Sequence, residues 1–174
     1  MPDTLVEKAA HLANKAAVRC TELPNIAVRH GDMAQLQGAY DLIWCAGALH
    51  FLGVTEGLNA WRSALAPNGR IAFFEPCYLG FAPEARLKAF WQDCSGTINA
   101  AGIEAAGRRV LGLRRVIGQV WADYYAALQR QIATLAPKTG TNLFAVLASS
   151  QAEIDGWRAA QDQIADTLYV VEPA

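Results

Sequence analysis

The first glycine of this 174-residue sequence is Gly31. The chain also lacks the patterns G-x-x-x-x-G-K-[ST], G-x-S-x-G, H-E-x-x-H and G-x-G-x-x-G. Each pattern positions the groups for one chemistry. Their absence therefore argues against nucleotide hydrolases, serine hydrolases, zinc proteases and ordinary dinucleotide-binding proteins.

Charge, long apolar runs and paired cysteines are scarce as well. The formal net charge is -1 and no basic block occurs, so nucleic acid is not an expected partner. No apolar run approaches the roughly 18 residues of a membrane helix, so we expect no membrane segment. No cysteines are spaced C-x-x-C, which favours reduced thiols in a cytoplasmic protein. The histidines show no ligand spacing with the cysteines, so no metal site is predicted.

The sequence has enough hydrophobic residues to form the core of one folded domain. Hydrophobic residues make up 53% of the chain, and no repeat or convincing boundary divides it, so we expect a single domain over residues 1–174. The stretch from Tyr40 to Pro76 organises it. Leu42 to Cys45 and Ile71 to Phe74 are short apolar runs typical of buried parallel strands. Between them, Val54, Leu58, Trp61 and Leu65 recur at helical spacing.

This strand–helix–strand unit predicts where a ligand binds. In open α/β sheets, ligands lie beyond the carboxyl ends of the strands. Here those ends are the segments 45–50 and 75–78. The flanking segments predict further elements: a helix opened by the capping box at 4–7, strands at 26–30, 110–116 and 168–171, and helices at 83–93, 97–106, 120–135, 143–147 and after the capping box at 150–153.

The chain resembles the C-terminal two-thirds of a class I S-adenosylmethionine-dependent methyltransferase of the small-molecule type. Gly31-Asp32-Met33 resembles the acidic turn that bonds the adenine amine. Tyr40-Asp41-Leu42-Ile43-Trp44 with Gly47-Ala48 resembles the strand and turn at the methyl-transfer site. The segment 57–69 resembles the helix and turn that follow. The resemblance implies a Rossmann-like α/β fold, incomplete at the N-terminus, with a mostly parallel sheet and a C-terminal antiparallel strand.

One departure from the family concerns the donor. The family's first strand ends in a glycine-rich turn and its second in an acidic residue that holds the ribose, and neither has a counterpart before Gly31. Two strand–helix units are therefore expected to be missing. Their loss predicts an unpaired sheet edge, which the chain either closes, leaves beside a displaced N-terminus, or covers by self-association or with a partner chain.

The resemblance also implies site residues. Asp32, Met33, Ala46 and Gly47 would contact S-adenosylmethionine, although an Asp after Gly31 is also a common turn former. His50 would act as a general base, or alternatively cap the next helix.

Three residues would contact a small-molecule substrate. Glu75 would bind a cationic substrate or act as a base, or else cap a helix or pair with a cation. Tyr78 and Tyr124 would line the substrate site, whereas aromatic residues at helical spacing more often pack in a core. Two hypotheses for the protein therefore stand: a small-molecule methyltransferase or its truncated derivative, and an inactive methyltransferase-like binding or scaffold protein.

Overall fold

The computed structural model describes residues 5–79, 85–90, 96–138 and 141–174. The chain divides into two compact units, Met1–Gln37 and Gly38–Ala174, which are described separately. The expectation of a single domain therefore stays a prediction. Trp91 and Cys94 lie outside the described residues.

The N-terminal unit contains one helix and one short turn of helix. Helix α1 spans Leu5–Arg19, which confirms the helix predicted there. The 3-10 helix η1 spans Met33–Gln35. The strand predicted at 26–30 is wrong, because this segment is irregular and Ile26 is exposed. A strand is stable only where a neighbour satisfies its backbone groups, and apolar alternation cannot supply that neighbour.

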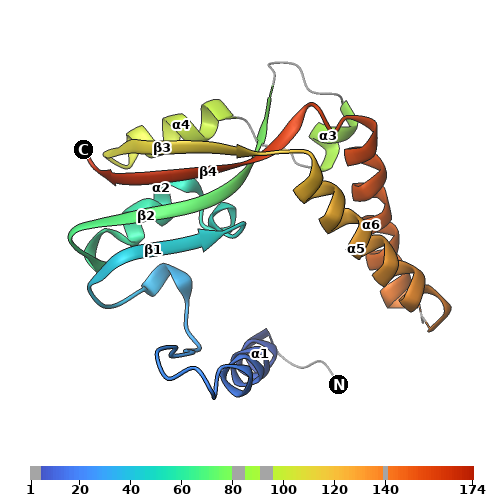
Figure 1. The fold of residues 1–174 in the computed structure, drawn as a ribbon, viewed down its shortest axis with the longest axis horizontal. Coiled ribbons are helices and arrows are strands. Elements are labelled where there is room, and N and C mark those ends of the chain that lie inside the picture. Colours follow the sequence, from blue (N-terminus) through green and yellow to red (C-terminus); the bar gives the residue numbers. More distant parts are fainter. Residues whose placement is uncertain (1–4, 80–84, 91–95, 139–140) are drawn as a thin grey trace. The chain divides into compact units, whose positions relative to one another are not determined.

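The C-terminal unit is built on a four-stranded mixed sheet (Figure 1). The strands are β1 (Tyr40–Ala46), β2 (Leu65–Tyr78), β3 (Arg108–Val116) and β4 (Ile164–Pro173), in the order β1-β2-β4-β3. The α/β fold and its antiparallel C-terminal strand are as predicted. The mostly parallel sheet is not: only β1–β2 is parallel, whereas β2–β4 and β4–β3 are antiparallel. The prediction of a mostly parallel sheet depended on a further parallel strand at 26–30, and this segment does not form one.

The central strand–helix–strand unit is confirmed. After β1 come the 3-10 helix η2 (Leu49–Phe51), helix α2 (Val54–Ala60) and the 3-10 helix η3 (Arg62–Ala64), which lead into β2. The turn at the start of β2 depends on Gly69. A Cβ there would lie 2.6 Å from the Tyr40 carbonyl oxygen and 2.9 Å from that of Ala66. Only glycine allows the two backbones to approach so closely.

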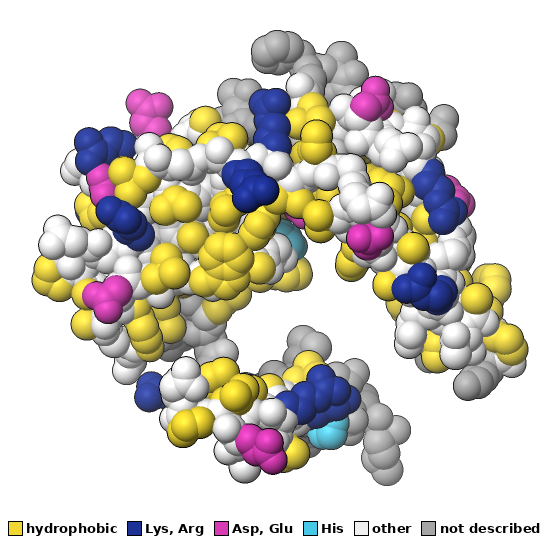
Figure 2. Space-filling model, viewed as in Figure 1, with side chains coloured by type: hydrophobic (Ala, Val, Ile, Leu, Met, Phe, Trp, Pro, Cys, Tyr) yellow, Lys and Arg dark blue, Asp and Glu magenta, His cyan; other side chains and the backbone are white. Residues whose placement is uncertain are grey.

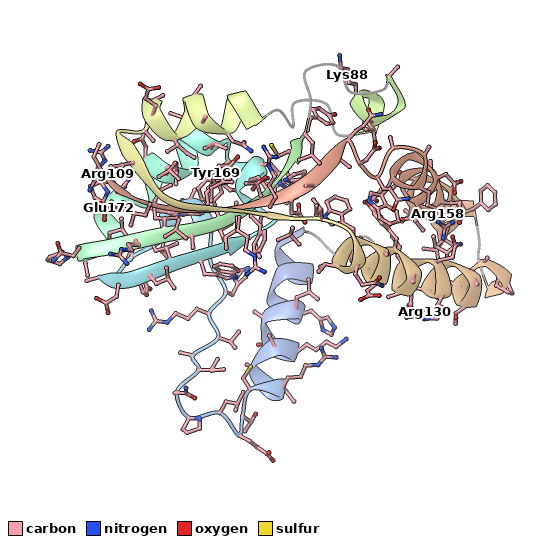
Figure 3. All side chains as sticks on the ribbon, turned by 45° about the horizontal axis from the view of Figure 1, so that its top comes forward. Lys88, Arg109, Arg130, Arg158, Tyr169 and Glu172 are labelled. Carbon is pink, nitrogen blue, oxygen red and sulfur yellow. The ribbon has the colours of Figure 1, made fainter. Side chains whose placement is uncertain are left out.

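Helices α2 and α4 (Gly96–Ala105) cover one side of this sheet (Figures 1 and 3). They contact each other through Thr55, whose hydroxyl donates to the Gly102 carbonyl at 3.3 Å. Between helices and sheet lies an apolar core. Its fully buried members include Leu49, Leu58, Ile71, Phe73, Ile103 and Val171.

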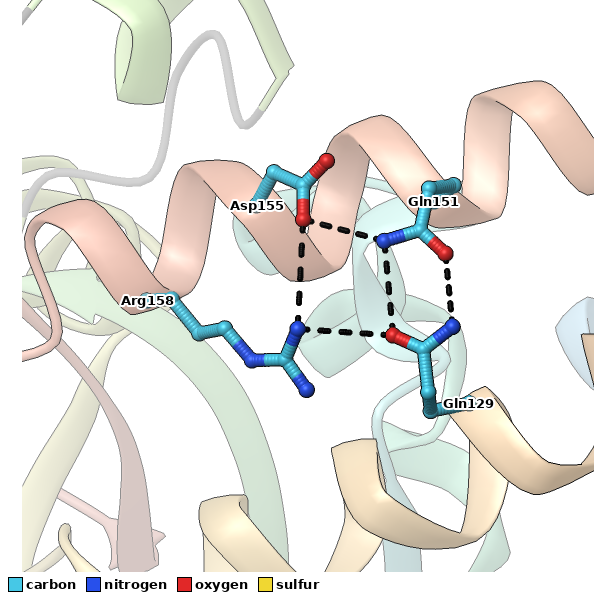
Figure 4. A network of polar contacts seen from close by, with 4 residues as sticks. All are labelled: Gln129, Gln151, Asp155 and Arg158. Atoms are coloured by element: carbon cyan, nitrogen blue, oxygen red, sulfur yellow. Dashed lines mark hydrogen bonds and ion pairs between the residues drawn. The ribbon is translucent and has the colours of Figure 1, made fainter.

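Helices α5 (Gln119–Leu135) and α6 (Thr141–Ala159) form a hairpin between β3 and β4 (Figure 1). The capping box predicted at 150–153 is wrong, because these residues lie inside α6. Polar contacts join the two helices (Figure 4). Gln129 Nε2 donates to Gln151 Oε1 at 2.7 Å, and Arg158 lies beside both Gln129 and Asp155. Helix α3 (Ala85–Phe90) joins the core beneath, which is formed by Tyr78, Leu87, Trp121, Tyr125, Ile132, Ile154, Trp157, Ala160 and Ile164.

Strand β1 is an edge strand with apolar residues exposed. Among the described residues it pairs only with β2, and Leu42 and Trp44 are 55% and 54% exposed. Hydrophobic side chains gather over the strands in the view of Figure 2. Glu172 on β4 forms an ion pair with Arg109 on β3 (Figure 3). Glu172 also lies 4.0 Å from Arg70 on β2. None of the helices in the described ranges is long and apolar enough to cross a membrane.

Candidate functional site

The carboxyl ends of β1 and β2 lie at the same end of the sheet because these strands are parallel. We call this place the carboxyl edge of the sheet, as distinct from the outer side of the edge strand β1. At the end of β1 the chain turns through Gly47, which has φ +64° and donates its backbone N–H to Phe74 O at 3.1 Å. A Cβ at Gly47 would meet nothing within 4 Å. The turn is therefore open and its backbone is accessible, with Ala46 exposed beside it.

His50 and Glu75 meet at this edge. Glu75 Oε1 accepts the backbone N–H of His50 at 3.0 Å, and Glu75 Oε2 lies 3.3 Å from His50 Nδ1. The imidazole is half exposed, whereas Glu75 is only 3% exposed. When Nδ1–H donates to the carboxylate, Nε2 keeps its lone pair and can accept a proton.

Burial sets the acidity of this carboxyl group. Desolvation raises the pKa of Glu75, and the neighbouring His50 opposes that rise. Burial also raises the pKa of the nearby Cys45 thiol, and the charge of Glu75 adds to the effect. Both groups therefore lie in a partly dehydrated environment, in which a hydrogen bond or a charge interacts strongly.

A second carboxylate lies on the adjacent strand. Asp166 on β4 is in register with Pro76, one residue beyond Glu75. Burial, and then the charge of Glu75, raise the pKa of Asp166 from 3.8 to about 6. The next residue, Thr167, is in register with Glu75 and is 1% exposed.

Further titratable side chains lie on the hairpin formed by α5 and α6. Tyr125 on α5 donates its hydroxyl to Glu153 Oε1 on α6 at 3.1 Å. Tyr124 is 57% exposed, and its ring meets that of Tyr125 edge-on at 5.0 Å. Burial raises the pKa of Tyr124, with smaller contributions from the charges of Glu153 and Asp166. Burial likewise raises the pKa of Glu153.

The predicted site residues fall into three groups. His50, Glu75, Ala46 and Gly47 are brought together where β1 and β2 end, and Tyr124 is exposed on α5. Tyr78 lies in the core, and its hydroxyl donates to the Leu87 carbonyl at 3.2 Å.

Asp32 and Met33 belong to the N-terminal unit. There Asp32 caps η1 by accepting the Ala34 backbone N–H at 2.9 Å. This is the turn-forming role that the sequence also allowed.

Sequence reasoning missed Asp166, Thr167 and Glu153. Glu153 was assigned to a helix cap, and Asp166 lies just before the last apolar run. No spacing in the sequence links Asp166 or Thr167 to Glu75, because only the antiparallel register of β2 and β4 brings those two residues near it. In the described part of the chain, no cluster of three or more His, Cys, Asp or Glu side chains is arranged to hold a metal ion.

The mixed sheet with helices on one side matches the Rossmann-like fold of solved S-adenosylmethionine-dependent methyltransferases. No family model and no curated protein matches the chain. Solved structures do. A SAM-dependent methyltransferase from Geobacter sulfurreducens, in complex with S-adenosyl-L-homocysteine, is 17% identical with a TM-score of 0.72, covering 93% of this chain and 71% of that one.

Two further structures show the breadth of this fold. A putative sarcosine dimethylglycine methyltransferase from Galdieria sulphuraria is 16% identical, with a TM-score of 0.67 over 91% of this chain. The [4+2]-cyclase SpnF is 14% identical, with a TM-score of 0.69 over 97% of it. The chain spans 63% of the length of each of these two proteins. The fold is therefore established, whereas the reaction depends on the site.

Proposed function

We propose that this protein transfers a methyl group from S-adenosylmethionine to a small molecule. The observation that carries the proposal is the His50–Glu75 pair at the strand ends of a fold that matches a methyltransferase bound to S-adenosyl-L-homocysteine. The carboxyl edge of such a sheet is where a ligand binds. A base held there can take the acceptor's proton.

The described residues can supply contacts to one part of S-adenosylmethionine. The open Gly47 turn, with Ala46 exposed beside it, provides accessible backbone near His50. We propose Ala46 and Gly47 as the donor contacts of the C-terminal unit. The glycine-rich turn and the ribose-binding acid of the family have no counterpart before Gly31. The rest of the donor is therefore not assigned to residues of this chain.

The donor, when bound, supplies an already activated methyl group, so the protein's part is mainly positioning. His50 Nε2 accepts the proton of the acceptor nucleophile. Glu75 holds the imidazole through Nδ1 and the adjacent backbone N–H. We propose that Tyr124, which is exposed on α5, contacts the acceptor. Tyr78 lies in the core, and we propose that it supports the substrate site from within.

The proposal is tested by transfer of labelled methyl from S-adenosylmethionine to a panel of small alcohols, phenols and amines. His50→Gln should lower the transfer rate about a hundredfold or more, as loss of a general base does. His30→Gln is the matched control, since His30 is exposed in the N-terminal unit. Equal rates for His50→Gln and the unaltered protein would contradict the assigned base.

A second function is favoured by a specific observation. Strand β1 is the edge of the described sheet, and Leu42 and Trp44 are exposed on it. An apolar sheet edge favours a methyltransferase-like protein that is inactive and binds a partner or serves as a scaffold. It predicts a folded chain without donor binding, which separates it from the first function.

We also propose that a second copy of the chain, or a partner chain, covers the edge of β1. Leu42 and Trp44 expose apolar surface beside unpaired backbone, which favours strand addition. Sedimentation should show a dimer that Leu42→Lys converts to a monomer. A compact monomer at high concentration would contradict this.

We also propose a cytoplasmic location. The free thiols of Cys20, Cys45 and Cys77 support it.

A further inference from the structure

Two arginines link the carboxyl ends of helices α2 and α4. Arg62, which follows α2, donates from Nη2 to the carbonyl of Ala106, just after α4, at 2.8 Å. Arg108, which follows α4, donates from Nη2 to the carbonyl of Leu58 on α2 at 3.3 Å. Each arginine therefore binds the end of the helix that the other one follows. These crossed hydrogen bonds hold the two guanidinium groups in one region.

Gly107 lies in the same region. A Cβ at this position would be 3.3 Å from Nη2 of Arg62, and Gly107 directly precedes Arg108 in the chain. Burial, and then the charge of Arg62, lower the pKa of Arg108. The contacts and the charge effect agree that two positive groups lie near each other.

Arg108 is buried without an anionic partner. It is only 5% exposed, and its Nε has no hydrogen-bond partner in the described part of the chain. Neither Arg108 nor Arg62 forms an ion pair with a described carboxylate. The last residue is bound nearby, since the Ala174 N–H donates to the Gly107 carbonyl at 3.1 Å, but its carboxylate pairs with neither arginine. An arginine is almost never buried so fully unless it is paired.

The helix ends balance only part of the positive charge. The carboxyl end of a helix carries the equivalent of about half a negative charge, so α2 and α4 together supply about one at most. Against the two guanidinium groups, an excess of about one positive charge remains. Each guanidinium also has N–H donors besides the one that binds a carbonyl. Positive charge with free donors favours an oxyanion, whose oxygens match the planar fork of an arginine.

This region lies at the opposite end of the sheet from the carboxyl edge. Strand β3 runs in the same direction as β1 and β2, because both β3 and β2 are antiparallel to β4. Arg108 is the first residue of β3 and therefore lies at its amino end. Helices α2 and α4 lie on one side of the sheet there (Figure 1). Arg62 is exposed, so solvent reaches the pair from its side.

We infer that an oxyanion, the phosphate or carboxylate group of a small molecule, binds at Arg62 and Arg108 where helices α2 and α4 end. Arg62 provides the accessible guanidinium, and the Nε–H of Arg108 is the donor that lacks a described acceptor. Binding here requires no methyl donor and does not involve His50. The site is therefore separate from the proposed site of methyl transfer.

Nuclear magnetic resonance titration of the 174-residue chain tests the inference. Sodium phosphate, sodium acetate and sodium chloride are compared at pH 7.5 and constant ionic strength, and the arginine Nε–H signals are followed. Phosphate should shift the Arg108 signal with saturation, because it carries more charge than acetate, and chloride should not. Tighter binding of phosphate assigns the site to phosphate groups, and tighter binding of acetate assigns it to carboxylates. A response to both oxyanions no larger than the response to chloride would overturn the inference.

Matched variants locate the site. Arg62→Gln removes the accessible guanidinium and should weaken phosphate binding about tenfold or more, as the loss of a charge-assisted contact does. Arg114→Gln is the control. Arg114 is exposed on β3 next to Arg115, and neither of them pairs with a described carboxylate. The control thus removes the same charge from a pair without a buried member. Equal weakening by both variants would contradict the location.

Thermal unfolding separates anion binding from simple capping of the helix ends. Phosphate should raise the Tm of the unaltered protein relative to chloride at equal ionic strength, because a ligand that binds only the folded state stabilises it. Arg114→Gln should keep this increase and Arg62→Gln should lose most of it. An Arg62→Gln protein that unfolds at a lower temperature but keeps the full increase would show that Arg62 only caps α4, and would overturn the inference.

Discussion

Glu75 contacts His50 at two points, the backbone N–H and Nδ1, across 25 residues of sequence. Both oxygens of the carboxylate are used, so the imidazole has a defined position although half of it is exposed. The parallel pairing of β1 and β2 places the two residues at the same edge. A buried carboxylate therefore orients an accessible imidazole.

Glu75→Gln should lower the methyl-transfer rate by roughly tenfold to a hundredfold, because the amide no longer accepts from Nδ1 with a full charge. Affinity for S-adenosylhomocysteine should change little, which separates positioning from folding. Steady-state kinetics with calorimetry measure both. Glu56→Gln, on the exposed side of α2, is the control. A variant with unchanged rate would contradict the positioning role.

Asp166→Asn should stabilise the protein at neutral pH. Because the folded-state pKa is raised from 3.8 to about 6, the folded protein binds the proton more tightly than the unfolded chain. Stability therefore falls as pH rises through this window. One pKa unit corresponds to about 1.4 kcal/mol, so the loss is at most about 3 kcal/mol.

Urea unfolding at pH 4 and pH 7 measures this effect. The free energy of unfolding of Asp166→Asn relative to the unaltered protein should be higher at pH 7 than at pH 4. The same difference at both pH values would show that burial does not perturb this carboxyl group.

Tyr125→Phe should reduce the free energy of unfolding by about 1–2 kcal/mol. The change removes the hydroxyl that donates to Glu153 and leaves that half-buried carboxylate without this partner. Tyr124→Phe is the matched control, because the hydroxyl of Tyr124 makes no hydrogen bond with a described residue. Chemical denaturation compares the two, and equal losses would contradict the assigned bond.

Gly69→Ala should destabilise the protein by about 2–3 kcal/mol or more, because its Cβ would press on two backbone carbonyls that cannot move aside easily. Gly112→Ala, on β3, is the control, since a Cβ there meets nothing within 4 Å. Thermal unfolding of both variants measures the difference. A Gly69→Ala protein as stable as Gly112→Ala would contradict the close approach at Tyr40.

The sequence predicted the parts of the fold that depend on local pattern. The segment 40–76 carries its own apolar runs, helix spacing and turn, so its two strands, its helix and the end of the sheet where the strands finish follow from the residues. His50 and Glu75 were predicted to lie near each other for the same reason.

Other features depend on partners that no local pattern names. The segment 26–30 has strand composition and no strand, because pairing decides that outcome. Asp166 and Thr167 lie near Glu75 only through the antiparallel register of β2 and β4. An aromatic residue such as Tyr78 can line a binding site, but the sequence does not show that α3 and the helical hairpin pack against it and make it part of the core.

The central claim is that this fold and edge serve methyl transfer from S-adenosylmethionine. Calorimetric titration of the 174-residue chain with S-adenosylhomocysteine tests it most directly. The account predicts one site per chain with a Kd in the micromolar range. It also predicts that binding persists in Glu75→Gln. No heat of binding at millimolar ligand, from a chain that circular dichroism shows to be folded, would contradict the claim and favour the inactive binding protein.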